Sequence, residues 1–241
     1  MPDQLVLRDC SASLDGQPII QPLSLELPSP GLHCLIGSNG AGKTTLLRLL
    51  CGLLDRTSGS VEFGGRDLLR MNGRDRAKYL GYVPQIADAG IPLNVRDSLE
   101  VARLSNSRSR ADIDSLLARL NLSALADRPL SRLSGGELKR AMIAQALAQD
   151  TQLLLLDEPT AHLDPPARRE VMQLMRDIAR QDGRLVLCSL HYPELAAEFA
   201  NSVVLLRDGA LLGHGDPQEM TTDAMLAELY AGSSDRVEAA T

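Results

Sequence analysis

Residues 37–44 have the types and spacing of a loop that binds nucleotide phosphates. The loop fits the pattern GxxxxGK[ST], and its members are Gly37, Ser38, Asn39, Gly40, Ala41, Gly42, Lys43 and Thr44. The glycines would let backbone N–H groups face the phosphates, Lys43 would reach the β- and γ-phosphates, and Thr44 would bind Mg²⁺. The alternative is a glycine-rich turn with a surface lysine. A predicted strand before the loop and a predicted helix after it favour the phosphate site.

Two adjacent carboxylates, Asp157 and Glu158, come directly after a run of leucines at 153–156. The run predicts a strand that is buried on both faces. Asp157 is suited to hold Mg²⁺, directly or through water. Glu158 could polarise an attacking water as a general base. A plain acidic pair at a helix start is the alternative, and the phosphate loop makes it the weaker one.

His191 and Gln85 each follow a further predicted strand. Ligands of open α/β sheets gather at the carboxyl ends of the strands, where His191 would lie. A single histidine is more often structural, and a single glutamine is more often an ordinary loop residue. As a neutral amide, Gln85 could contact both a metal ion and a water molecule.

A serine and two glycines precede a predicted helix at 137–148, in the sequence Leu133-Ser134-Gly135-Gly136-Glu137. A helix start offers N–H groups and a positive dipole end to an anion. Taken alone, this sequence is also an ordinary helix cap. Since the chain already has a phosphate loop, a second anion-binding turn needs its own phosphate or shares one across two molecules.

The rest of the chain must position these groups, and its pattern is that of an α/β protein. Strands are expected at 4–7, 23–27, 31–36, 60–63, 81–83, 152–156 and 184–189. A helix is expected at 44–51, a turn at 15–18, and a hairpin at 203–212 with Asp208 and Gly209 in its turn. Ile113, Leu116, Leu117 and Leu120 mark one face of a helix in an inserted helical segment.

Composition excludes several classes of function. A net charge of -6 without a long basic run argues against nucleic acid as a partner. No apolar stretch approaches the roughly 18 residues needed to span a bilayer, and the N-terminus lacks a signal-peptide pattern. The four scattered cysteines form no CxxC pair and are expected to be small apolar residues in a reducing cytosol.

The ordered set of motifs resembles the ATP-binding subunit of ABC transporters, over nearly the whole chain. The matching motifs are Walker A at 37–44, a Q-loop glutamine at Gln85, the LSGGE signature at 133–137, Walker B at 153–157 with the glutamate Glu158, a D-loop at 161–164 and an H-loop histidine at His191.

The resemblance implies a P-loop NTPase fold: a RecA-like core with an N-terminal antiparallel β subdomain and a helical subdomain insertion. In a single domain over 1–241, the β subdomain and core would occupy 1–87, the helical subdomain about 88–138, the core again 139–232, and a frayed tail 233–241. Two copies would enclose two ATP molecules, each held by Walker A of one copy and the signature of the other.

The resemblance also assigns roles to residues. Glu158 and His191 would be catalytic. Mg²⁺ would be held by Thr44, Gln85 and Asp157. ATP would be bound by Gly37, Ser38, Asn39, Gly40, Ala41, Gly42, Lys43, Thr44, Thr45, Ser134, Gly135, Gly136 and Asp164.

One departure concerns the adenine base. Family members commonly stack an aromatic side chain on adenine, but the corresponding place near Leu14 is not aromatic, and the first aromatic residue is Phe63. Base stacking contributes roughly 1–3 kcal/mol in nucleic-acid binders. We therefore expect weak selectivity for adenine, with phosphate contacts dominating affinity.

The segments at 91–97, 204–209, 214–217 and 221–230 resemble ATPases that drive iron-siderophore, haem or cobalamin uptake. The resemblance implies a peripheral subunit on the cytoplasmic face of the cell membrane, bound to permease subunits and acting indirectly with a periplasmic binding protein. An exporter or lipid-transport ATPase stays open. A ribosome-associated ABC protein would carry two ATPase domains, and a DNA-repair ABC ATPase would need a long coiled coil, which the chain lacks.

Overall fold

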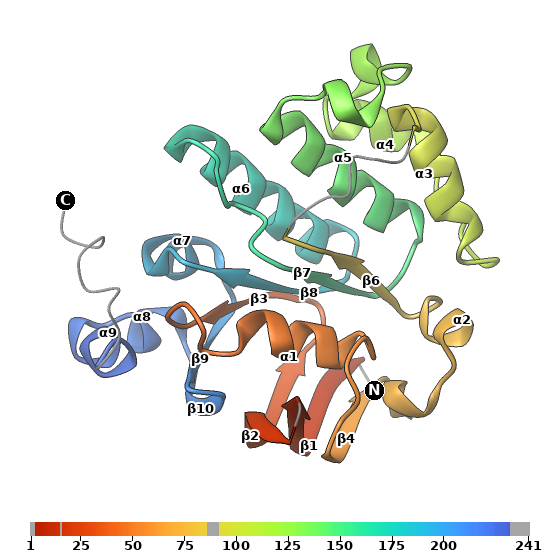
Figure 1. Cartoon of the computed structure of the whole chain (residues 1–241). Helices are drawn as coiled ribbons and strands as arrows, with labels where there is room; N and C mark the ends of the chain where they lie inside the picture. The colour runs from red at the N-terminus through yellow and green to blue at the C-terminus, as the bar shows by residue number, and fades with distance from the viewer. Residues whose placement is uncertain (1–2, 15, 86–91, 232–241) are drawn as a thin grey trace.

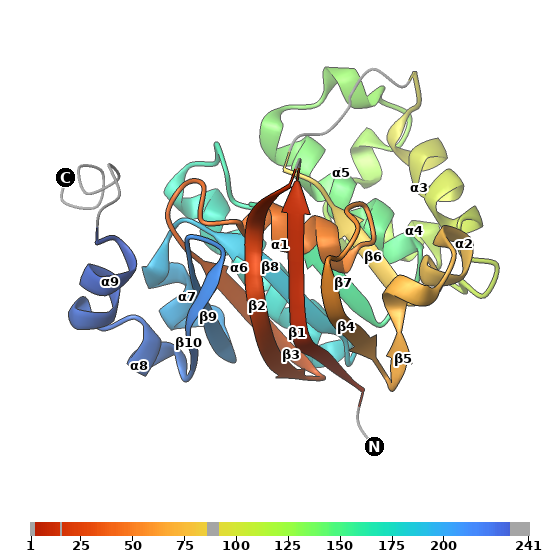
Figure 2. The ribbon, with the colours of Figure 1, turned by 60° about the horizontal axis from the view of Figure 1, so that its bottom comes forward.

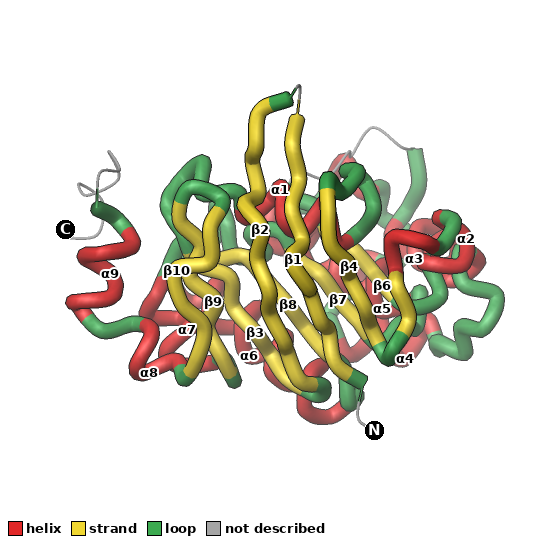
Figure 3. The backbone as a smooth tube through the Cα atoms, turned by 90° about the horizontal axis from the view of Figure 1, so that it is seen from below, coloured by secondary structure: helices red, strands yellow, loops and turns green. Residues whose placement is uncertain are grey.

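Two β-sheets face each other across helix α1 in the computed structural model, which describes residues 3–14, 16–85 and 92–231 (Figures 1 and 2). The larger sheet has the order β10-β9-β3-β8-β7-β6, in which β10 is antiparallel to β9 and the others are parallel. The smaller, antiparallel sheet has the order β2-β1-β4-β5 (Figure 3).

The strands are β1 (Gln4–Leu14), β2 (Gln17–Pro28), β3 (Gly31–Ile36), β4 (Ser58–Phe63), β5 (Arg66–Asp67), β6 (Leu80–Val83), β7 (Leu153–Leu156), β8 (Leu185–Leu190), β9 (Ser202–Arg207) and β10 (Ala210–Gly215). The α-helices are α1 (Lys43–Leu50), α2 (Gly73–Arg76), α3 (Val95–Leu104), α4 (Ile113–Arg119), α5 (Gly135–Ala148), α6 (Pro165–Gln181), α7 (Pro193–Phe199), α8 (Pro217–Met220) and α9 (Asp223–Leu229). Short 3₁₀ turns occupy Leu68–Arg70, Ser123–Leu125 and Leu130–Arg132.

The leucine run of β7 is buried on both faces of the larger sheet, as predicted. Leu153 and Leu155 pack into the core that contains α1 and the antiparallel sheet. Leu154 and Leu156 pack into the core beneath helices α3 to α7. Successive strand side chains point to opposite faces, so a continuous apolar run fills two cores at once. Every strand expected in the larger sheet is present.

The N-terminal strands are longer than predicted, because a bulge in β1 interrupts the sequence pattern that indicates a strand. Strand β1 pairs with β2 from Gln4 to Leu14, but the register shifts between Leu7 and Cys10. Asp9 in this interval has a φ of 43°. A bulge breaks the alternation of apolar and polar residues, and the sequence pattern predicted only 4–7 of β1 and 23–27 of β2 as strands.

Helices α3, α4 and α5 form an arm beside the core, in the region where a helical insertion was expected (Figure 1). Helix α5 starts at Gly135, two residues earlier than predicted, and continues to Ala148. The expected subdomain boundary at residue 138 therefore falls inside one helix that arm and core share. The start of the predicted insertion, 88–91, and the predicted frayed tail, 233–241, lie outside the described residues.

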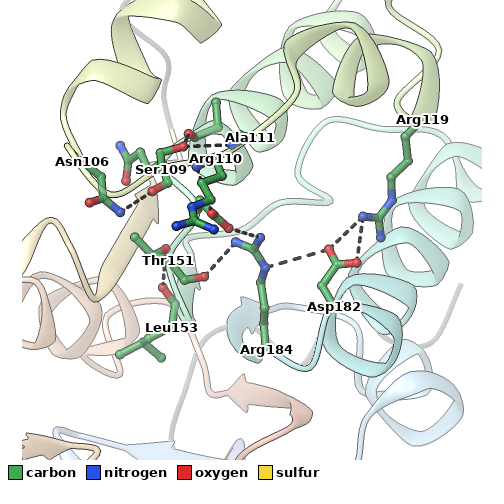
Figure 4. Close-up of polar contacts among 12 residues, drawn as sticks. Asn106, Ser109, Arg110, Ala111, Arg119, Thr151, Leu153, Asp182 and Arg184 are labelled. Atoms are coloured by element: carbon green, nitrogen blue, oxygen red, sulfur yellow. Dashed lines mark hydrogen bonds and ion pairs between the residues drawn. The ribbon is translucent and has the colours of Figure 1, made fainter.

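A polar network ties the arm to the core at the amino ends of β7 and β8 (Figure 4). Both carboxylate oxygens of Asp182 accept hydrogen bonds from Arg119, at 3.0 and 2.8 Å. Arg184 donates to the Thr151 carbonyl at 2.7 Å and to Asp150 at 3.0 Å. Asn106 donates to the Gln149 carbonyl at 2.7 Å. These contacts fix the arm at the end of the sheet that is remote from the phosphate loop.

The hairpin of β9 and β10 supports the phosphate loop from the side. Its turn residues, Asp208 and Gly209, both have positive φ, as a tight type I′ turn requires. The Gly209 N–H donates to the Ala41 carbonyl at 3.0 Å. A Cβ at Gly209 would lie 2.0 Å from the Ile19 carbonyl oxygen, so only glycine fits here. The predicted hairpin is confirmed, and it fixes the loop against β2.

Within the described stretches, no helix has both the length and the apolar character needed to cross a bilayer.

His33 is fully buried in β3 and is held as a neutral ring. It lies 2.9 Å from the Pro28 carbonyl through Nε2 and 2.8 Å from the Ser202 hydroxyl through Nδ1. Burial lowers the pKa of His33 to about 4; the Pro28 hydrogen bond opposes this and the charge of His214 adds to it. The unfolded chain has the ordinary pKa near 6.5.

We expect the free energy of unfolding to fall by about 3 kcal/mol as the pH drops from about 6.5 to about 4, because the unfolded state then binds a proton that the folded state excludes. Urea unfolding at several pH values should show this slope, and His33→Gln should flatten it. His162→Asn, at an exposed histidine, is the matched control. An equal slope in His33→Gln and wild type would contradict the assignment.

Candidate nucleotide site

The phosphate loop lies where the sequence predicted it, between the end of β3 and the start of α1. Gly42 caps α1 with a φ of 99° and no side chain, which leaves the first N–H groups of the helix open to a ligand. Lys43 is buried, and its Nζ donates to the carbonyls of Gly37 and Ser38 at 2.7 and 3.1 Å. The ammonium group therefore sits inside the curl of the loop.

Packing explains the first glycine of this loop. A Cβ at Gly37 would lie 2.3 Å from the Leu206 carbonyl oxygen, so any side chain would push the loop away from β9. Gly40 instead has a φ of 79° and open space around a would-be Cβ. Glycine is thus needed at one position for close contact with the sheet and at the other for backbone conformation.

Parallel strands in register bring the polar residues together. Val83 of β6 pairs with Leu156 of β7, which in turn pairs with Cys188 of β8. The residues that follow Val83 and Leu156 therefore leave the sheet at one edge, and β8 continues two residues further, to Leu190. Figure 1 shows this edge beside the loop that enters α1.

Asp157 is buried and linked to the phosphate loop. Its Oδ1 accepts a hydrogen bond from the Thr44 hydroxyl at 3.1 Å and one from the Ser189 hydroxyl at 2.8 Å. Ser189 also accepts from the Glu158 N–H at 2.8 Å. Sequence reasoning missed Ser189, although its place two residues before His191 on β8 put it at the same sheet edge.

Glu158 has both carboxylate oxygens in hydrogen bonds. Oε1 accepts from His191 Nε2 at 2.5 Å, and Oε2 accepts from the Gln85 amide at 2.6 Å. The residue is 9% exposed and has a φ of 46°, a conformation that non-glycine residues rarely adopt. The structure therefore joins the predicted base, the predicted histidine and the predicted glutamine in one cluster.

Opposing effects set the charge of Glu158. Burial raises its pKa, but the hydrogen bond and charge of His191, followed by the charges of Lys43 and Lys139, outweigh burial and hold the pKa below its ordinary value. The group is therefore an anion at neutral pH and available as a proton acceptor.

Lys139 is a second residue that sequence reasoning missed. It lies on α5, is buried, and its Nζ donates to the Gln85 carbonyl at 3.2 Å. Lysine is rarely buried without a partner, and here it joins the helical arm to the segment that carries Gln85. A lysine five residues after Ser134 gave no signal of its own in the sequence.

The signature turn (residues 133–137) is separate from this cluster. The side-chain hydrogen bonds of Ser134 and Glu137 stay within the turn. The Glu137 N–H donates to the Ser134 hydroxyl at 3.4 Å, and the Glu137 carboxylate accepts from the Ser134 N–H at 2.7 Å. This is a capping box, and it explains why two glycines begin a stable helix. The backbone hydrogen bond from Ser134 also lowers the pKa of Glu137.

Asp164 in the D-loop caps a helix as well. Its Oδ1 accepts from the Ala167 N–H at 2.8 Å at the start of α6. The D-loop is further fixed by Arg168, which donates to the Leu163 carbonyl at 2.7 Å and stacks on the Tyr192 ring at 4.0 Å. The side chain of Leu14, the expected adenine position, lies outside the described residues.

The donor set suits a magnesium ion that arrives with its nucleotide. The Thr44 hydroxyl and the Asp157 carboxylate are oxygen donors 3.1 Å apart, and Ser189 orients the carboxylate. Mg²⁺ is usually bound by one or two carboxylates together with substrate phosphates. Among the described residues, no cluster of three or more His, Cys, Asp or Glu side chains could hold a metal by itself. Gln85, the third predicted ligand, contacts Glu158 here.

A phosphate loop before α1, a Walker-type aspartate and glutamate after β7, and a histidine after β8 define a P-loop NTPase. Together with the antiparallel sheet and the helical arm, they form the cassette fold of ABC ATPases. The family model for ABC transporters matches residues 20–161, more than half of the chain, and the chain belongs to this family. It is an ABC transporter ATPase that binds and hydrolyses ATP.

Relatives of known function cover most of the chain. It is 33% identical over 231 residues to the achromobactin transport ATP-binding protein of Dickeya dadantii, covering 92% of this chain and 86% of that one. It is 32% identical to the hemin import ATP-binding protein of Shewanella denitrificans, covering 94% of this chain and 92% of that one. A solved structure described as a metal-chelate type ABC transporter, in an inward-facing conformation, has a TM-score of 0.81 at 27% identity, covering 96% and 90%.

Proposed function

We propose that this chain drives the uptake of a metal chelate, an iron-siderophore complex, haem or cobalamin, as the ATPase subunit of an importer. The observation that carries the proposal is its likeness, at about a third of positions and over most of both chains, to ATPases named for achromobactin transport and hemin import. A protein named for cobalamin import shares 33% identity, although this chain spans only 54% of it. None of these three relatives is named for export or for lipid transport, the alternative functions.

The site residues divide the work of hydrolysis. The backbone N–H groups of residues 37–45 and the Lys43 ammonium would bind the phosphates and balance their charge. Thr44 and Asp157 would hold Mg²⁺, which when bound neutralises charge on the β- and γ-phosphates. Glu158 would take a proton from the attacking water, and His191 would hold Glu158 and contact the γ-phosphate.

The second half of each ATP site would come from another copy of the chain. Gly135 has no positive φ, and a Cβ there would meet nothing within 4 Å. The fold of one chain therefore gives no reason for glycine at this position. Close approach of an external group to the start of α5 does give one. Ser134, Gly135, Gly136 and Asp164 would complete the partner's ATP site in a homodimer.

The dimer would dock on two permease subunits at the cytoplasmic face of the cell membrane. ATP binding would close the two copies and hydrolysis would reopen them, which moves the permease. A periplasmic binding protein would deliver the chelate from the other side. Selection of the chelate would lie with the permease and the binding protein, because the ATPase site holds only nucleotide.

Deleting the gene should abolish uptake of one chelate class. We expect radiolabelled iron-siderophore, haem or cobalamin uptake to fall at least about tenfold in the deletion strain, since transport depends on hydrolysis. A plasmid copy of the wild-type chain should restore it, and Glu158→Gln should not. Unchanged uptake of all three chelate classes in the deletion strain would sink the importer proposal.

A further inference from the structure

Lys139 connects two parts of the site that the sequence motifs treat as separate. It lies on α5, the helix that begins at the signature turn, and about one and a half turns after Ser134. Its Nζ binds the main-chain carbonyl of Gln85 at 3.2 Å, and the Gln85 side chain binds Glu158 at 2.6 Å. The signature turn and the catalytic carboxylate of one chain are therefore joined through a single buried lysine.

Gln85 donates to Oε2 of Glu158 and takes one of the two acceptor positions of that oxygen. The other oxygen, Oε1, is taken by His191. Both carboxylate oxygens are therefore engaged in hydrogen bonds within one chain. Release of Oε2 requires that Gln85 move, and the backbone of Gln85 is held by Lys139.

Helix α5 is well suited to transmit a displacement from its first turn to Lys139. It is continuous over 14 residues, and its first turn is held by the capping box. Lys139 is only 6% exposed, so its side chain has little room to adjust when the helix moves. Burial lowers the pKa of Lys139, and the charges of Asp157 and Glu158 oppose this effect.

We propose that Lys139 is a positioning residue that couples the two ATP sites of the dimer. Docking of the signature turn on the partner's ATP shifts α5, Lys139 carries the Gln85 backbone with it, and Gln85 releases Glu158 of the same chain. Each base is therefore fully freed from Gln85 when the signature of its own chain is engaged. This inference rests on the proposed homodimer, and it makes hydrolysis cooperative in ATP.

Lys139→Met tests the coupling, because it keeps the apolar stem and removes the donor. The Hill coefficient for ATP hydrolysis should lie above 1 in the wild type, with about 2 as the limit for two sites, and should fall to about 1 in Lys139→Met. Lys139→Arg keeps donors and should restore the wild-type coefficient. Lys78→Met, at a lysine paired with Asp75 away from the site, should leave it unchanged.

Melting temperatures establish first that each variant is folded, and Lys139→Leu, which also lacks a donor, takes the place of Lys139→Met if the methionine variant is not. A wild-type coefficient of 1, or equal coefficients in wild type and Lys139→Met, would overturn the coupling. ATP-dependent dimerisation of Glu158→Gln is measured in parallel. If that protein stays monomeric, the proposed homodimer is wrong. If it dimerises and hydrolysis by Lys139→Met remains cooperative, only the proposed role of Lys139 is wrong.

Discussion

Replacing Glu158 with glutamine should slow ATP hydrolysis by about 10²–10⁴-fold, the range that a positioned general base contributes. Glutamine has nearly the same shape, so His191 and Gln85 can still pack against it. It lacks the negative charge that the surrounding cations stabilise in Glu158, and it cannot take a proton from water. Phosphate release measured at saturating ATP tests this expectation.

ATP binding by Glu158→Gln should stay within about threefold of wild type, because binding depends mainly on the phosphate loop and Lys43. A fluorescent ATP analogue measures this separately from turnover. Glu170→Gln, at an exposed glutamate on α6, is the matched control and should hydrolyse ATP normally. Near-normal turnover in Glu158→Gln would show that another group activates the water.

Ser134→Arg should abolish hydrolysis while the chain still binds ATP. The Ser134 side chain is exposed and faces the open start of α5, where the partner's phosphate is expected. Arginine would place a bulky side chain in that space and remove the hydroxyl. Loss of the helix cap costs about 1 kcal/mol, which a folded domain tolerates. We expect at least about a 10²-fold loss, comparable to removing a donor that stabilises transition-state charge.

The control for Ser134→Arg is Ser115→Arg, which puts the same side chain on an exposed position of α4. It should keep wild-type turnover. Equilibrium binding of an ATP analogue to dilute Ser134→Arg should match wild type, since its own phosphate loop is unchanged. If Ser134→Arg hydrolyses ATP at the wild-type rate, the signature turn does not complete a nucleotide site.

Much of the core could be predicted, because the residues suited to catalysis directly follow strands that the sequence shows to be buried. The leucines of β7 must be buried on both faces, and a parallel strand of this kind ends at the sheet edge where ligands bind. Asp157, Glu158 and His191, which follow such strands, were therefore expected at this edge of the sheet. The hairpin at Asp208 and Gly209 could also be predicted, since positive φ at both turn residues restricts the choice of residues.

Contacts that depend on tertiary packing could not be predicted. The position of Ser189 near His191 indicated the sheet edge but not its hydrogen bond to Asp157, and nothing in the local sequence distinguishes Lys139 from an ordinary helix lysine. The continuity of β1 across its bulge also depends on its pairing with β2. Gln85 was expected beside a metal ion, and the structure adds a contact to Glu158 that its position in the sequence did not indicate. The roles of the site residues toward ATP stay predictions.

Light scattering on Glu158→Gln tests most directly whether the chain works as a pair. We expect a mass near the 26.0 kDa of one chain without nucleotide and twice that mass with ATP and Mg²⁺. The double variant Ser134→Arg with Glu158→Gln should remain at the mass of one chain under both conditions. A mass that does not change with ATP in Glu158→Gln, or a doubling that persists in the double variant, would show that two chains do not pair through ATP and the signature turn.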